Sequence, residues 1–541
     1  MTPVGAGSEG RDAGRVKGGG SVASRGADPD PGGSPSPLSL AGALLPLGVM
    51  LALLAAGAVA GRLDTEYLVV VLLVSAASAG MVASRHGHGW EAIQRSTGEK
   101  LAGVLPAILI LLAIGMLIAT WVLSGTIPFL VYWGVRLIRP RYLVVTAFLA
   151  TALMSTCTGT SWGSAGTIGV ALMGTAAALG APLAATAGAV VSGAYLGDKM
   201  SPLSDSTNIS AIGAGADLYA HIRHMMYTAA PSTLVCLVVY ASLAGLLPVP
   251  AAGARGAGDG ASALLSDLRS VFSLSPLVLL PPAVVVWSIL RKTPAALAMT
   301  ISSLLAVALG VLLQGFGLHD ALVAAVSGFR VDMVASAGAD PAALGPAFRT
   351  LVERGGLYSM ATTLVLIIAA FLLAGAMDVS GALDLLIGRM LARVRSVFGL
   401  IASTMASGAT MIAMTSHGGV TALVVGELFQ KAYDERGLAR VNLSRSLEDS
   451  VTITEPLMPW TVSAVFMATT LGVPTWRYAP WACFCYGGPI FSLLIAAAWR
   501  RTGFGIRTAA ADGPAAPAGA PSSGGAAGGP GGPAAAKPAG R

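Results

Sequence analysis

The chain has 541 residues, of which 54% are hydrophobic and only 11% are charged, and its formal net charge is +7. Soluble globular domains carry about 25% charged residues, so this composition argues against a soluble protein. The positive balance fits the basic loops of an inner-membrane protein, and we expect no nucleic-acid partner.

Both ends of the chain differ from its middle. Residues 1–37 and 508–541 consist mainly of Gly, Ala, Pro and Ser, which predicts disordered tails. Between them lie apolar runs that approach the roughly 20 residues of a membrane-crossing helix. These runs are Leu38–Ala60, Tyr67–Ala83, Val104–Trp121, Leu143–Cys157, Ala229–Leu247, Leu274–Leu290, Ala295–Leu313, Leu357–Ala376, Val397–Met414, Pro456–Leu471 and Tyr478–Trp499. We predict an all-α polytopic membrane protein with about 10–12 membrane segments.

Basic residues gather outside the first and last of these runs. Four precede the first run and three follow the last: Arg11, Arg15, Lys17, Arg25, Arg500, Arg501 and Arg507. The positive-inside rule therefore predicts that both termini are cytoplasmic. The first run is as long as a full span, so we expect it to stay as a membrane helix and not to be cleaved as a signal peptide.

The four cysteines give no metal centre. Cys157 and Cys236 fall inside apolar runs, and Cys483 and Cys485 have no second pair of ligands elsewhere. We predict that all four are packing residues, with no bound cofactor.

Three landmarks recur in the same order, 254 to 256 positions later. Ser124-Gly125 returns as Ser380-Gly381, and the stretch from Thr160 to Gly163 returns as Thr415 to Gly418. Pro202, Leu203 and Thr207 return as Pro456, Leu457 and Thr461. In both copies the Ser-Gly pair is followed by a cluster of arginines, which are Arg136, Arg139 and Arg141 in the first copy and Arg389, Arg393 and Arg395 in the second. The chain therefore contains two copies of one helical unit.

The copies divide the chain into seven predicted parts. These are a tail (1–37), two membrane helices (38–103), repeat 1 (104–215), connecting helices and loops (216–356), repeat 2 (357–472), a last membrane helix (473–507) and a tail (508–541). By analogy with other repeat transporters we expect inverted repeats. Inversion would put the two arginine clusters on opposite faces, which the positive-inside rule disfavours for one of them, so parallel repeats stay open.

Each repeat is broken by Gly and Pro residues inside an apolar stretch. In hydrocarbon, such breaks survive only where they are buried in protein or line a polar cavity, because every backbone amide needs a partner. Two broken helices in corresponding places are a pointer to a transport site.

The stretch Ser192–Asn208 follows an apolar run directly and carries Asp198, Lys199 and Asp205. Ionised groups at the bilayer centre cost about 2.5–3.5 kcal/mol each, so these side chains must face protein or water. Sodium prefers oxygen ligands, and Lys199 can neutralise one of the two acids. The candidate sodium ligands are Asp198, Ser201, Asp205, Thr207, Asn208, Thr160 and Ser161. A surface loop between two helices is the alternative.

The second copy supplies candidate proton-coupling groups. Glu455 lies at the break itself, and His417 takes the place of Trp162. Glu448 and Asp449 follow Arg436, Arg440 and Arg445, which favours a role as interfacial partners of those arginines over a role as ligands. The predicted proton-coupling residues are Asp205, Asp198, Glu455, His417 and Asp449.

Gly159-Thr160-Ser161-Trp162-Gly163 fits the G-x-S-x-G pattern of a hydrolase nucleophile. That motif acts only on a strand-to-helix turn, and here a membrane span precedes it. An intramembrane hydrolase with Ser161 as nucleophile is therefore the weaker hypothesis.

Two long strings, Gly159–Gly174 (GTSWGSAGTIGVALMG) and Ser192–Asn208 (SGAYLGDKMSPLSDSTN), resemble the signature segments of the NhaC family of sodium/proton antiporters. The resemblance extends through Thr415–Gly419 and Glu448–Pro459 to most of residues 40–500. It implies a multi-pass antiporter of the bacterial plasma (inner) membrane, not an enzyme. Sodium ion and proton would be its substrates and the lipid bilayer its surroundings, with no cofactor.

The resemblance also implies a mechanism, alternating access. Asp205 or Asp198 would bind sodium from one side and release it when a proton arrives from the other. The family includes members that exchange organic acids such as malate and lactate with sodium and protons, so that alternative stays open, as does a homo-oligomer.

Overall fold

The computed structural model describes residues 38–246, 257–291, 293–392 and 396–509. Most of the predicted tails, together with Arg393 and Arg395, lies outside these residues. The described part of the chain is helical, with one isolated β-bridge between Leu438 and Thr508 and no strand. The all-α prediction is confirmed.

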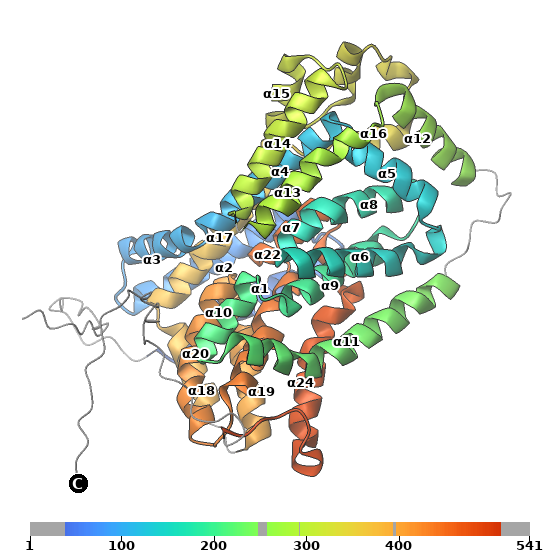
Figure 1. Cartoon of the computed structure of the whole chain (residues 1–541). Helices are drawn as coiled ribbons and strands as arrows, with labels where there is room; N and C mark the ends of the chain where they lie inside the picture. The colour runs from blue at the N-terminus through green and yellow to red at the C-terminus, as the bar shows by residue number, and fades with distance from the viewer. Residues whose placement is uncertain (1–37, 247–256, 292, 393–395, 510–541) are drawn as a thin grey trace, which may run out of the picture. The chain divides into compact units, whose positions relative to one another are not determined.

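Twenty-four α-helices make up the described ranges (Figure 1). The first three are α1 (Leu40–Val59), α2 (Thr65–Arg85) and α3 (Trp90–Gly103). The first broken unit contains α4 (Leu105–Leu123), α5 (Thr126–Leu137), α6 (Leu143–Thr158), α7 (Ser161–Ser164), α8 (Val170–Ala178), α9 (Leu183–Met200) and α10 (Asp205–Ala214). The connecting helices are α11 (Leu218–Leu246), α12 (Ala257–Val271), α13 (Leu280–Leu290), α14 (Ala295–Leu312), α15 (Leu318–Ser327) and α16 (Pro346–Val352). The rest are α17 (Ala361–Val379), α18 (Ala382–Ala392), α19 (Val397–Thr415), α20 (Gly418–Asp434), α21 (Arg440–Leu447), α22 (Val462–Leu471), α23 (Thr475–Tyr478) and α24 (Cys483–Thr502).

Nine helical segments in the described ranges are long and apolar enough to cross a membrane, and one bent pair would make a tenth. The bent pair, Ala261–Val271 with Pro276–Ser288, turns by 98°. The predicted span Leu274–Leu290 is therefore the second arm of a bent pair and not a straight helix. The predicted span Pro456–Leu471 is also broken, because its regular helix, α22, begins only at Val462.

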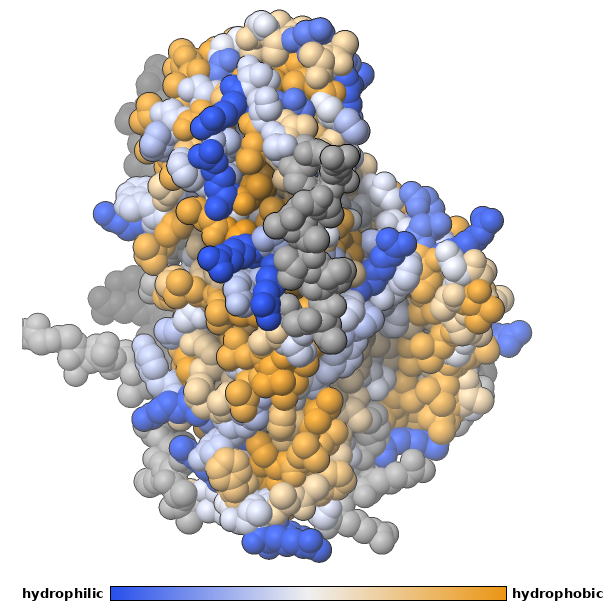
Figure 2. All heavy atoms as spheres, turned by 90° about the vertical axis from the view of Figure 1, so that its right-hand side faces the viewer, coloured by the Kyte–Doolittle hydropathy of each residue, from blue (hydrophilic) through white to orange (hydrophobic). Residues whose placement is uncertain are grey.

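Hydrophobic side chains cover broad areas of the face drawn in Figure 2. Leu153, Val238 and Leu304 each keep more than 60% of their surface exposed, although they lie within long apolar helices. Exposed leucines on this scale are the expected surface of a protein whose solvent is lipid.

The two predicted copies share a series of backbone conformations. α4 and α17 both end in a serine followed by a glycine with positive φ, Gly125 and Gly381. α6 and α19 both end in a left-handed residue, Gly159 (φ 67°) and Ser416 (φ 58°). The next residues, Thr160 and His417, are extended in the same way, and each starts a new helix.

These landmarks fix the correspondence between the copies at 257 positions from Gly159 onward. The caps Ser204 and Thr461 obey the same offset, as do the terminal glycines Gly215 and Gly472. The match of Ser124-Gly125 with Ser380-Gly381 therefore holds, whereas the two later letter matches are two and three residues out of register. In the corrected register Asp198 corresponds to Glu455.

In each copy, the helix that follows the Pro-containing break packs against the other copy. α10 packs on α20, and α22 packs on α7 and the π-helical turn Ala165–Gly169 (Figure 1). Trp162 stacks on Phe466 with ring centroids 4.3 Å apart. The equivalent contact in the other crossing is Gly419 against Ile209, where a Cβ on the glycine would lie 3.4 Å from Ile209 Cδ1. The breaks of both copies therefore meet at one place.

Candidate cation site

α9 carries Asp198 and Lys199 into the protein interior because two of its glycines allow close packing on α6. A Cβ on Gly193 would lie 2.3 Å from the backbone oxygen of Phe148, and one on Gly197 would lie 2.4 Å from that of Ala152. Small residues at this spacing are how membrane helices bring their backbones together. Asp198 is 6% exposed and Lys199 is 1% exposed, so the surface-loop alternative is wrong for these two side chains.

The helix stops at Met200, and the chain then turns into α10. Ser201 is extended, and Ser204 caps α10 by accepting a hydrogen bond from the backbone of Thr207 at 3.3 Å. This break places the second residue of α10, Ser206, beside Asp198. Ser206 Oγ lies 3.2 Å from Asp198 Oδ2, and the hydroxyls of Ser204 and Ser161 also interact with that carboxylate.

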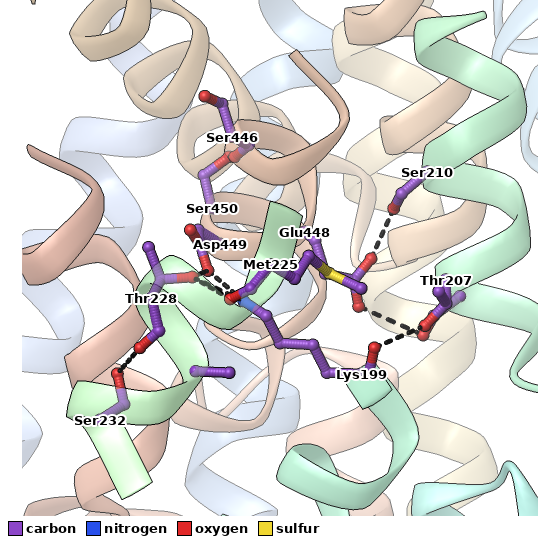
Figure 3. A network of polar contacts seen from close by, with 12 residues as sticks. Lys199, Thr207, Ser210, Met225, Thr228, Ser232, Ser446, Glu448, Asp449 and Ser450 are labelled. Carbon is purple, nitrogen blue, oxygen red and sulfur yellow. Dashed lines mark hydrogen bonds and ion pairs between the residues drawn. The ribbon is translucent and has the colours of Figure 1, made fainter. Parts of the chain in front are cut away.

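Glu448 approaches the same serine from the second copy. It begins a π-helical turn, Glu448–Thr452, directly after α21, and its side chain is fully buried. Ser206 Oγ lies 3.4 Å from Glu448 Oε1, and Ser210 donates to Glu448 Oε2 at 2.6 Å (Figure 3). Single π-helical turns occur preferentially at functional sites. One hydroxyl therefore lies between two carboxylates, one from each copy.

Lys199 forms a buried ion pair with Asp449, the neighbour of Glu448 (Figure 3). Thr228 of α11 lies 3.5 Å from Lys199 Nζ and donates to Asp449 Oδ1 at 3.3 Å. Both ionic side chains are fully buried, and removing one partner of such a pair typically costs about 3–5 kcal/mol. The pair therefore ties α9 of the first copy to the π-helical turn of the second.

Two expectations about charge partners are corrected by these contacts. Lys199 pairs with Asp449 and not with either acid of its own copy. Glu448 and Asp449 contact α10 and Lys199, whereas Arg440 pairs with the exposed Asp434. Arg445 does act electrostatically on Asp449, but its Nη1 donates to the backbone of Gly505. The expected arginine pairing is therefore wrong for Glu448, and for Asp449 the arginine acts beside a direct partner, Lys199.

The other predicted ligands of this stretch support the break. Asp205 is exposed as the first residue of α10, so its role as a sodium ligand stays a prediction. Thr207 donates to the backbone of Asp198 at 3.2 Å, and Asn208 donates to that of Ser204 at 2.7 Å. Ser201 accepts from the backbone of Leu203 at 3.3 Å.

Thr160 caps α7 at its Oγ1, 3.2 Å from the Gly163 amide, and so presents Ser161 to Asp198. The residue before Thr160 ends a helix, not a strand, so the turn required for a hydrolase nucleophile is not formed.

Glu455 and His417 lie at the other crossing. The carboxylate of Glu455 accepts hydrogen bonds from the backbone of Gly418 and from Ser463, which begin α20 and α22. Ser463 corresponds to Ser206 at the 257-residue offset, so the contact repeats the one between Ser206 and Asp198. His417 caps no amide with its side chain, and its Nδ1 has no partner within the described residues. Their coupling roles stay predictions.

The sequence did not predict that Ser206, Ser210 and Glu448 meet beside Asp198. Ser206 and Ser210 are four residues apart, so they share one face of α10, and this spacing was readable once the helix start was known. The approach of Glu448 depends on how the copies pack, which no local pattern shows.

Comparison with known proteins agrees with this architecture. The profile of the Na+/H+ antiporter family matches residues 42–217 and 193–499. The chain is 43% identical to an uncharacterized Na(+)/H(+) antiporter of Haemophilus influenzae over 86% of its own length and 96% of that protein. It is 34% identical to the Na(+)/H(+) antiporter NhaC of Alkalihalophilus pseudofirmus, over 83% and 94% of the two chains. It is 30% identical to the Malate-2H(+)/Na(+)-lactate antiporter of Bacillus subtilis, over 82% and 91%.

Proposed function

The chain belongs to the Na+/H+ antiporter family and exchanges sodium for protons; we propose that it does so at the buried pair of carboxylates Asp198 and Glu448. The observation that carries this proposal is the position of Ser206, whose Oγ lies 3.2 Å from one carboxylate and 3.4 Å from the other.

A serine hydroxyl has a single proton, so it can donate to only one of its two carboxylate neighbours at a time. The second contact is favourable only if that carboxyl carries a proton of its own or if a cation lies between the two groups. The geometry therefore suits a carboxylate pair, Asp198 and Glu448, that holds either a shared proton or a sodium ion. Exchange follows because the pair cannot hold the proton and the sodium ion at the same time.

The charges around the pair favour the same conclusion. Lys199 forms its ion pair with Asp449 and acts on Glu448 only as a longer-range charge, so within the described residues neither Asp198 nor Glu448 has a direct ion-pair partner. Two ionised carboxylates in a buried site repel each other unless a cation joins them. Sodium is a hard ion that takes oxygen ligands, and Ser206 and Ser210 supply neutral ones beside the two acids.

The site draws on both copies, which suits alternating access. Asp198 and Ser206 belong to the first copy and Glu448 to the second, so a movement of one copy against the other changes the oxygen cage. We place the two copies in inverted orientation and both termini in the cytoplasm of a bacterial cell, on the plasma membrane. Arg500 and Arg501 in the last turn of α24, with Arg507 beyond it, support the cytoplasmic C-terminus.

Exchange in proteoliposomes tests the proposal. Asp198→Asn and Glu448→Gln should each abolish sodium-driven proton movement, followed with an internal pH-sensitive dye, while the protein still inserts and elutes as the wild type. The matched control is Asp434→Asn, which removes an exposed carboxylate at the end of α20. This control variant should exchange normally. Normal exchange by both site variants would refute the assignment.

A second function, coupled exchange of small organic acids, is favoured by one observation. The chain is similar over most of its length to an antiporter of malate and lactate. The same vesicles distinguish the two functions: if sodium-driven proton movement needs malate or lactate, organic-acid exchange replaces simple sodium/proton exchange.

A further inference from the structure

A polar stripe runs along α11, the helix that follows the first copy. Its members are His221, His224, Thr228 and Ser232, which are spaced by three, four and four residues and so lie on one face. All four side chains have 0% exposure. Buried ionisable groups within a membrane helix are functional candidates.

The stripe faces the second copy. His224 Nε2 lies 3.1 Å from Oδ1 of Asn442, a residue of α21, and Thr228 donates to Asp449 at 3.3 Å. Ser232 donates to the backbone of Thr228 at 2.6 Å (Figure 3). The polar face of α11 therefore ends on the ion pair of Asp449 with Lys199.

Several atoms on and beside this stripe lack hydrogen-bonding partners within the described part of the chain. Among the described residues, neither ring nitrogen of His221 has a hydrogen-bonding partner, and the same is true of His224 Nδ1 and Asp449 Oδ2. An unsatisfied buried polar atom costs about 1–3 kcal/mol. Such atoms are costly in a purely structural role, which makes the two rings candidates for a function.

The charged groups around the two rings come from four elements. Lys199 of α9 and Arg445 of α21 act on His221, and Arg445 and Arg507 act on His224. The stripe reaches an acid of the second copy at Asp449, which Thr228 links to α11. A neutral imidazole can accept a proton on one nitrogen and release one from the other, so it can pass a proton without storing it.

We propose that His221 and His224 form a proton route along α11 that leads from the start of this helix to Asp449. The inference rests on the sodium site proposed above and names how protons reach it. His221 is the fourth residue of α11, and Thr228 lies about 10 Å further along the axis at 1.5 Å per residue. The rings are positioning and carrier groups; Asp198 and Glu448 hold the exchanged ions.

Two transport modes separate this route from a structural role. Counterflow of radioactive sodium against unlabelled sodium needs the ion site but no proton, whereas sodium/proton exchange needs both. His221→Gln and His224→Gln should lower the rate of sodium-driven proton movement at least about tenfold. They should leave sodium counterflow unchanged, and they should alter the pH profile of exchange. His319→Gln, an exposed histidine of α15, should alter neither mode.

Three outcomes decide the matter. Equal loss of both modes in both histidine variants would show a structural role and overturn the route. Full retention of proton movement in the double variant would overturn it as well. The proposed sodium site has a separate test. If Asp198→Asn keeps sodium counterflow, the sodium site is refuted, whatever the result for the histidine variants.

Discussion

Removing the charge of Glu448 should weaken sodium binding severely without unfolding the protein. Glu448→Gln keeps the size of the side chain and one oxygen that can accept the hydrogen bond from Ser210, which is 2.6 Å long in the wild type. The loss is the attraction between the carboxylate and the ion. Two unit charges 4 Å apart at an effective dielectric constant of 20 attract by about 4 kcal/mol.

Part of that attraction is recovered, because the substituted amide still offers an oxygen ligand. A net loss of about 2.7 kcal/mol corresponds to a dissociation constant raised about 100-fold. Binding of radioactive sodium to the purified protein in detergent, at a pH high enough to remove competing protons, measures this change. Asp434→Asn is the informative comparison, since Asp434 is exposed and should shift the constant by less than about threefold. A Glu448→Gln variant that binds within threefold of the wild type refutes the reasoning, as does a larger effect at Asp434.

Three further predictions concern stability, measured as the midpoint of thermal unfolding in detergent. Gly197→Ala should destabilise the protein by about 3 kcal/mol or prevent its folding, because the new Cβ would lie 2.4 Å from a backbone oxygen of α6. The control is Gly98→Ala on α3, whose new Cβ would meet nothing within 4 Å. Because alanine favours the helix over glycine, this control should raise the midpoint. Ser416→Gly should stabilise the chain by about 1 kcal/mol, since φ is 58° there. Lys199→Met should cost about 3–5 kcal/mol by leaving Asp449 unpaired, and adding Asp449→Leu should restore most of that loss.

Each of these has an outcome that contradicts it. Equal midpoints for the two glycine variants would mean that α6 and α9 do not pack as closely as described. A lower midpoint for Ser416→Gly would mean that its hydroxyl contributes more than the strained backbone costs. A double variant at Lys199 and Asp449 no more stable than the single one would show that the ion pair is not the isolated unit described above.

The sequence was sufficient to predict the membrane helices and the burial of Asp198. A long apolar run in lipid must form a helix, because the helix satisfies every backbone hydrogen bond within the segment. An acidic residue directly after such a run must be buried in protein or face water, because exposing its charge to lipid is too costly. The register of the copies was not accessible in the same way. Gly159 and Ser416 are equivalent through a left-handed backbone conformation, not through a shared letter, so matching letters aligned Ser161 with Ser416 instead.

The composition of the site needed tertiary packing. Asp205 and Ser206 are adjacent, and only the phase of α10 decides which of them faces Asp198. Glu448 follows Arg445 in sequence, which suggested a charge pair, yet the π-helical turn directs its carboxylate toward α10.

The central claim, that sodium and protons compete for Asp198 and Glu448, is tested most directly by proton release. Sodium added to the purified wild-type protein in weakly buffered detergent solution should release protons, detected with a pH indicator, with a sodium dependence that matches binding. The double variant Asp198→Asn with Glu448→Gln should release none. Release from the double variant equal to that of the wild type would contradict the account, because the exchanged proton would then come from another site.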